Sequence, residues 1–308
     1  MAQTQAIEAP LTTHATFVTL TVTPGQESRV KEVLGDIGGL IKTVAFRDAQ
    51  ARFSLTVGIG ARVWDGCTGL PRPKDLRPFK EIKGAKHTAP STPGDLIFHI
   101  RADRRDLCFE FERHLLTQLG DAVSLIDEVV GFRYFDARDL LGFVDGTANP
   151  VGAGIHDSTL VTEAEDGECV GGAYLVTQKY LHDLPGWNKL KTEDQEAIIG
   201  RTKIDNVELP DQGDQDQKPH KQLSTIVDDE GNEYDILRDN MPFGSPGKGE
   251  YGTFFIGYSR RLWVIEEMLK RMFVGVPEGK HDRILDYSKA VTGNTFFVPS
   301  AEMLAKIG

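Results

Sequence analysis

The chain has 308 residues, of which 40% are hydrophobic and 26% charged, an ordinary composition for a globular protein of about two domains. Its 35 basic and 46 acidic side chains give a formal charge of −11, which argues against a protein that binds nucleic acids or anionic membranes. No apolar run approaches the roughly 18 residues that a membrane-spanning helix needs.

The cysteines and the first residues bear on the compartment. Cys67, Cys108 and Cys169 show no C-x-x-C spacing, so neither a disulfide framework nor a thiolate zinc site is indicated. The N-terminal residues lack the basic and apolar regions of a secretory signal. We therefore expect a soluble cytoplasmic protein.

The first half of the chain alternates strand and helix patterns. Residues 16–22 alternate apolar and polar side chains and lead into Pro24-Gly25, which predicts a half-buried strand and a turn. Apolar side chains at helical spacing predict a helix over 26–40 that ends at Gly38-Gly39. Two further strands, over 51–59 and 94–102, and a long helix over 105–119 complete this half.

The second half repeats the pattern, with strands predicted over 172–178 and 252–258 and helices over 187–199 and 261–273. Phe17 and Tyr174, and likewise Arg104 and Arg260, occupy equivalent places at nearly the same offset. We therefore predict a duplicated α+β fold, with antiparallel sheets covered by helices on one face. The halves are assigned to residues 1–150 and 151–308.

Residues 142–150 (GFVDGTANP) place Asp145 between two glycines. The carboxylate can form a local turn or cap a helix, as aspartates in such segments often do. Alternatively, it faces a pocket from a rigid loop and exchanges protons. The segment alone does not decide between these interpretations.

His220 follows an acidic, polar stretch over 205–218, which predicts a solvated loop. A lone histidine is usually a surface residue, but imidazole is also the usual axial ligand of haem iron, and its second nitrogen then donates to a carboxylate. Asp282 and Asp286 both qualify as that carboxylate.

Arg238 precedes a turn marked by Pro242 and Gly244. Carried into a pocket beside Asp145, it would be a fixed cation able to stabilise negative charge on a bound oxygen species. Asn240, two residues on, would share its side of an extended strand. Arg201 is a further candidate for binding an anionic group, whereas His281 is expected at the surface.

Taken in order, these segments resemble the dye-decolourising peroxidases, particularly the bacterial intracellular type. The match runs from GFVDGTANP through WNKLKTEDQEAIIGRTK, His220, ILRDNMPFG and GTFFIGYSR to DRILDYSKAVTGNTFFVPS. The resemblance implies two ferredoxin-like domains and haem b (iron protoporphyrin IX) held in the C-terminal one. It also implies an intracellular enzyme that forms homo-oligomers.

By the same resemblance, His220 looks like the axial iron ligand, Asp145 and Arg238 like the distal pair and Asn240 like a further distal hydrogen-bonding group. Arg201 is similar to an arginine that meets a haem propionate. Asp282 is favoured over Asp286 as the partner of His220, because it starts the family's D-R-x-L-D segment.

Two departures from the family pattern are visible. Ala148 stands where some relatives carry a manganese-binding glutamate, and the chain ends soon after FFVPS, without the longer tail that some relatives use to enter encapsulin shells. Neither manganese oxidation nor encapsulation is therefore expected.

The implied activity is reduction of hydrogen peroxide coupled to oxidation of bulky organic donors such as dyes or phenols. The main alternative is a haem-binding or haem-iron-release protein without significant peroxidase turnover. A chlorite-decomposing haem enzyme and a haem-free interaction module are further alternatives. A carrier needs the axial histidine but no distal acid and guanidinium, so Asp145 and Arg238 distinguish the first two.

Overall fold

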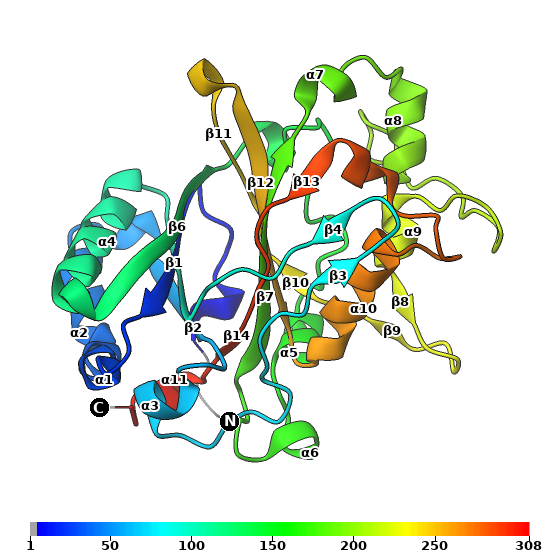
Figure 1. The fold of residues 1–308 in the computed structure, drawn as a ribbon. Coiled ribbons are helices and arrows are strands. Elements are labelled where there is room, and N and C mark those ends of the chain that lie inside the picture. The colour runs from blue at the N-terminus through cyan, green and yellow to red at the C-terminus, as the bar shows by residue number, and fades with distance from the viewer. Residues whose placement is uncertain (1–4, 308) are drawn as a thin grey trace.

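The structure is a computed structural model that describes residues 5–307 (Figure 1). Its centre is a large sheet in which every pairing is antiparallel, with the strand order β10-β12-β7-β14-β2-β5-β1-β6. The fold is therefore α+β, as predicted. No helix within residues 5–307 is long and apolar enough to cross a bilayer.

The first half has the β-α-β-β-α-β arrangement of a ferredoxin-like domain. Its four main strands are, in chain order, β1 (His14–Val22), β2 (Ser54–Ile59), β5 (Leu96–Ala102) and β6 (Val123–Phe132). They lie in the order β6-β1-β5-β2. Helices α1 (Glu27–Gly35) and α2 (Ile37–Ala45) follow the first strand, and α4 (Arg105–Leu119) follows the third.

The second half repeats this order. Its strands are β7 (Ala173–His182), β10 (Leu237–Arg238), β11 (Met241–Ser245), β12 (Glu250–Ser259) and β14 (Asn294–Val298). β14, β7 and β12 are neighbours in that order, and β10 and β11 both pair with β12. Helices α7 (Leu184–Trp187), α8 (Thr192–Ile199) and α9 (His220–Ser224) follow β7, and α10 (Leu262–Phe273) follows β12. The predicted duplication is thus seen in the strand order.

The two halves meet through their sheets. The Phe297–Ile59 pair joins β14 to β2, and the ring of Phe17 on β1 stacks on Phe254 of β12 at 4.2 Å between centroids. Leu175 and Phe296 belong to the same buried cluster, which takes residues from both halves. The helices of each half lie on the outside, with α1, α2 and α4 on one side of the strands and α8, α9 and α10 on the other (Figure 1).

Shorter elements fill the connections. A hairpin of β3 (Ile82–Lys83) and β4 (Thr88–Ala89) leaves the first half and lies beside α10 (Figure 1). The others are α3 (Trp64–Thr68), α5 (Ala153–Thr159), α6 (Glu163–Asp166), β8 (Ile226–Val227), β9 (Glu233–Tyr234), β13 (Ser288–Ala290), α11 (Ala301–Leu304) and the 3-10 helices Ala6–Glu8, Ala49–Ala51, Gly120–Ala122, Phe135–Ala137, Pro246–Lys248 and Arg283–Asp286.

Two predicted helices differ from the observed ones. Gly38 and Gly39 do not end a helix: the break comes at Asp36, and α2 runs through both glycines. Each glycine costs about 0.5–1 kcal/mol in a helix interior, but α2 buries Ile37, Leu40 and Val44, which offsets that cost. The helix predicted over 187–199 is divided into α7 and α8.

Candidate functional site

A cavity of about 990 Å³, partly open to solvent, lies in the second half of the molecule. Strands β7 and β12, helix α10 and the segment 139–145 form its walls, and His220 at the start of α9 lines it. Its apolar lining is Leu141, Phe143, Val144, Ile199, Ile236, Phe255, Ile265, Met268, Leu269, Met272 and Ile284.

His220 presents one ring nitrogen to this cavity. Its Nδ1 lies 2.6 Å from Oδ2 of Asp282, a fully buried carboxylate whose Oδ1 accepts a hydrogen bond from the backbone of Ile284. About a third of the His220 side chain remains accessible, and among residues 5–307 its Nε2 has no hydrogen-bond partner. A proton on Nδ1 satisfies Asp282 and leaves the Nε2 lone pair available to a metal.

The charge on His220 is set by two opposing effects. Burial lowers the pKa of the imidazole, but the Asp282 carboxylate raises it by more, so the net direction is upward. The same carboxylate increases the electron donation that Nε2 can offer to a ligand.

A second histidine that lines the cavity is already fully engaged. His182 has Ser288 Oγ at 2.8 Å from Nδ1 and Thr253 Oγ1 at 3.0 Å from Nε2. Burial lowers its pKa to about 4, so it is neutral near pH 7. Only His220 therefore combines a carboxylate partner with an uncommitted nitrogen among the histidines of this cavity.

The two aspartates proposed for His220 have different surroundings. Asp282 contacts His220, whereas Asp286 Oδ1 contacts Lys86, His87 and His281. The structure therefore brings Asp282, and not Asp286, to the imidazole. The expectation that His281 is a plain surface residue is not met, since only 18% of its side chain is exposed.

Asp145 lines the cavity from a turn between two glycines. Gly142 and Gly146 have φ angles of +94° and +77°, which side chains with a Cβ rarely adopt. The Oδ1 atom of Asp145 accepts a hydrogen bond from the backbone N–H of Gly146 at 2.7 Å. The local turn and the orientation toward the cavity are thus present together, although the sequence suggested them as alternatives.

Arg238 and Asn240 reach the same cavity from β10 and the residues that follow it. Asn240 Nδ2 lies 3.4 Å from Asp145 Oδ1, and its own Oδ1 accepts from the backbone of Ile256. The only hydrogen bond of the Arg238 guanidinium among residues 5–307 is a weak one to Met268 Sδ at 3.8 Å. Asp239, between them, points away and is buried against Arg101, which agrees with the predicted alternation.

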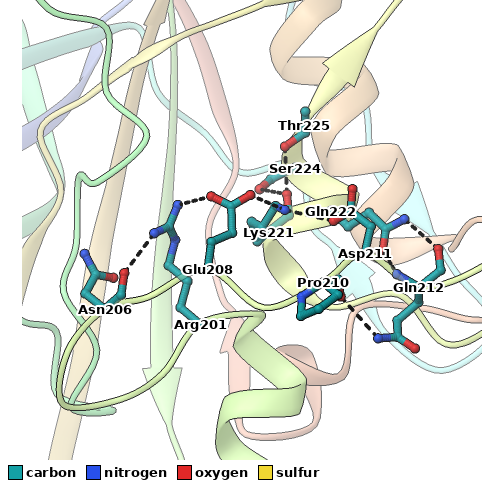
Figure 2. A network of polar contacts seen from close by, with 10 residues as sticks. All are labelled: Arg201, Asn206, Glu208, Pro210, Asp211, Gln212, Lys221, Gln222, Ser224 and Thr225. Atoms are coloured by element: carbon teal, nitrogen blue, oxygen red, sulfur yellow. Dashed lines mark hydrogen bonds and ion pairs between the residues drawn. The ribbon is translucent and has the colours of Figure 1, made fainter.

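Arg201 lines an adjoining cavity of about 730 Å³, which shares His220, Asp145 and Arg238 with the first. Its guanidinium donates to Glu208 at 2.9 Å and to the Asn206 carbonyl at 3.1 Å (Figure 2). Glu208 also pairs with Lys221 of α9, which in turn contacts Asp211 (Figure 2). The loop over 205–218 is largely exposed, as predicted, but two of its carboxylates fasten it beside the cavity.

Two site residues were not assigned a role from the sequence. Asn149 bonds both the backbone N–H and the carbonyl of Arg238, at 3.0 and 2.7 Å, and so fixes the strand that carries the guanidinium. Asp139 lines the cavity, and burial raises its pKa to about 7. Asn149 lies within the GFVDGTANP segment, but its role depends on contact with a strand 89 residues away.

Comparisons with known families cover nearly the whole chain. The family model described as Dyp-type peroxidase, N-terminal, matches residues 4–133, and the C-terminal model matches residues 136–303. A dye-decolorizing peroxidase of Mycolicibacterium paratuberculosis is 52% identical over 305 residues, covering 98% of this chain and 85% of that protein. One from Mycobacterium tuberculosis is 49% identical over 300 residues, covering 97% and 89%.

Solved structures agree. DyPB from Rhodococcus jostii RHA1 has a TM-score of 0.93 at 50% identity, covering 98% of this chain and 97% of that one. DypB variants of the same organism in complex with heme also have a TM-score of 0.93. A distant relative, the deferrochelatase of Escherichia coli K12, is 25% identical over 185 residues, covering 55% of this chain and 42% of that protein.

Proposed function

The chain belongs to the Dyp-type peroxidase family, and we propose that His220, Asp145 and Arg238 form its peroxidase site. The protein is a haem-dependent peroxidase with the duplicated ferredoxin-like fold of that family. The observation that supports this site is the convergence of an imidazole, a carboxylate and a guanidinium on one apolar cavity.

The residues of the cavity fit a haem group. The apolar walls suit a porphyrin, and the uncommitted Nε2 of His220, backed by Asp282, suits its iron. Arg201, in the adjoining cavity, would meet a propionate, and for that its contact with Glu208 must be exchanged or shared. When bound, the haem iron supplies the redox chemistry that reduces peroxide and withdraws electrons from a donor.

The distal residues would handle protons and charge. Asp145 Oδ1 is held by the Gly146 N–H, while Oδ2 accepts no hydrogen bond from residues 5–307. This oxygen is placed to accept a proton from one peroxide oxygen and to return it to the other. The Arg238 guanidinium, with little else to bond, would stabilise the negative charge that develops on the departing oxygen.

Asn240 and Asn149 would position this pair. Asn240 Nδ2 faces Asp145 Oδ1 at 3.4 Å, and Asn149 holds the Arg238 backbone on both sides. Neither side chain changes protonation state, so both act by orienting their neighbours.

Haem ligation is tested with His220→Ala. We expect the Soret band of the haem-loaded protein to disappear, because the nitrogen that would bind the iron is lost. His114→Ala, which removes a surface histidine of α4 paired with Glu110, is the matched control and should retain the full band. A normal Soret band in His220→Ala would exclude this histidine as the ligand.

The distal pair is tested with Asp145→Ala and Arg238→Leu. Both variants should still bind haem, but their rapid reaction with hydrogen peroxide, followed by stopped-flow absorbance, should slow by about 10²-fold or more. Unchanged kinetics in both would instead favour the second candidate, a haem-binding or iron-release protein, to which the distant deferrochelatase match points.

We also propose a reducing, cytoplasmic location and a homo-oligomeric state. Cys67, Cys108 and Cys169 are all buried and unpaired in the part of the chain described, which fits a reducing compartment. Cell fractionation and light scattering of the haem-loaded protein test these two points.

Ala148 lies at the adjoining cavity, and its side chain offers no ligand for a manganese ion.

A further inference from the structure

Two histidines and an aspartate meet at a second place, separate from the haem cavity. The nitrogen and oxygen ligand atoms of His87, His281 and Asp286 all lie within 4.8 Å of one another. The Nε2 atoms of His87 and His281 are 2.8 and 3.0 Å from the same oxygen, Oδ1 of Asp286. We propose that this triad is a binding site for a divalent first-row transition-metal ion.

The ligand types favour such an ion. Imidazole nitrogen is preferred by zinc, nickel, copper and iron, whereas magnesium and calcium prefer oxygen ligands alone. Two histidines and one carboxylate on one side of an ion are a known arrangement for divalent iron, with open positions left for water or another ligand.

The three side chains already converge on one atom, because both imidazoles lie within hydrogen-bonding distance of Oδ1 of Asp286. An ion that binds there would replace these hydrogen bonds, and water would fill its remaining positions.

The triad is partly exposed, so an ion can enter and keep water ligands. The side chains of His87, His281 and Asp286 are 20%, 18% and 21% accessible. Lys86 also contacts Asp286 Oδ1, at 2.5 Å, but 59% of its side chain is exposed. Its ammonium group thus occupies the position of a competing cation and can swing out into solvent.

The three ligands come from both halves of the chain. His87 belongs to the turn of the β3–β4 hairpin, while His281 and Asp286 flank Asp282 in the second half. Gly84, in the same turn, is pressed against the end of α10, because a Cβ there would lie 1.9 Å from the Phe273 carbonyl oxygen. A bound ion would therefore clamp this hairpin to the segment that carries the partner of His220.

The experiment is isothermal titration of chelator-treated, haem-loaded protein with Ni²⁺. We expect one site per chain that is lost in the double variant His87→Gln/His281→Gln, together with at least a tenfold weakening in Asp286→Asn. The His114→Gln variant, which removes a surface histidine elsewhere, should bind like the parent.

Lys86→Gln distinguishes a metal site from a purely structural cluster, and it keeps all three ligands. Removal of the competing ammonium should tighten Ni²⁺ binding about fivefold to tenfold. Hydrogen exchange of residues 82–89 should also slow on addition of Ni²⁺ in the parent but not in His87→Gln. Absence of a saturable site, equal binding in the double variant, or weaker binding in Lys86→Gln would each overturn the proposal.

Discussion

At the scale of single residues, the property that distinguishes His220 from His182, the other histidine of the cavity, is its buried carboxylate partner. Asp282→Asn removes the negative charge but keeps the shape of the side chain. We expect haem affinity to fall about 10–100-fold and the ferric/ferrous midpoint potential to rise, because a less basic imidazole stabilises ferric iron less. Haem transfer to an apo-globin and spectroelectrochemistry measure the two effects.

Asp286→Asn is the matched comparison for that prediction. It makes the same chemical change four residues away, at a carboxylate that contacts Lys86, His87 and His281 rather than His220. With a chelator present, its haem affinity and potential should equal those of the parent. If the two variants shift the potential equally, the assignment of Asp282 as the partner is wrong.

The sequence could identify the motif residues but not their contacts. Asp145, His220 and Arg238 were found because each lies in a segment with its own pattern of glycine, proline or charge. The choice between Asp282 and Asp286 could not be made from spacing, since both follow His220 by about 60 residues. It depends on Lys86 and His87, which approach Asp286 from 200 and 199 residues away.

At the scale of elements, the sequence patterns did not predict strands β6 and β14, and a physical reason can be given for each. β6 is an edge strand whose Ser124, Leu125 and Ile126 are exposed and which carries Asp127 and Glu128, so it lacks regular alternation. β14 has only five residues and is buried throughout, and a short apolar run does not identify its own structure. Strands β1, β2, β5, β7 and β12 and helices α4 and α10 were predicted correctly, but β1 was expected to be half-buried and is instead buried on both faces.

Helix α4 carries an acidic residue whose charge opposes folding. Glu112 is 7% exposed and faces Glu128 of β6; burial and that carboxylate raise its pKa to about 7 from 4.5. The folded state thus holds its proton more tightly than the unfolded chain, and stability falls as pH rises from about 4.5 to about 7. We expect Glu112→Gln to raise the thermal midpoint at pH 8 and to leave it nearly unchanged at pH 4.

Glu110→Gln on the same helix provides the opposite case. The Arg113 guanidinium lowers the pKa of Glu110 to about 2, so its charged form favours folding above pH 4.5. Its replacement should not raise the midpoint at pH 8. A rise of equal size in both variants would show that loss of net negative charge, and not the burial of Glu112, is responsible.

At the scale of the whole molecule, an apolar interior and a buried ion pair hold the two halves together. Arg101 of β5 in the first half donates at 2.9 Å to Oδ2 of Asp239, which lies between Arg238 and Asn240 in the segment that joins β10 to β11. The two side chains are 0% and 3% exposed. This pairing could not be read from the sequence, because a strand residue and a turn residue 138 positions apart carry no shared pattern.

Arg101→Met leaves the Asp239 carboxylate buried without its cation, and loss of one partner of a buried pair costs about 3–5 kcal/mol of unfolding free energy. Burial already raises the pKa of Asp239, and Arg101 opposes this rise. Without Arg101 the pKa climbs further, so the folded variant can take up a proton at low pH and the destabilisation shrinks there. We therefore expect a large loss in the urea midpoint at pH 8 and a smaller one at pH 5.

The control variant is Arg52→Gln, which breaks the exposed pair with Asp103 within the first half. It should shift the urea midpoint much less. Equal losses in the two variants, or no change with pH in Arg101→Met, would show that the buried pair does not hold the halves together.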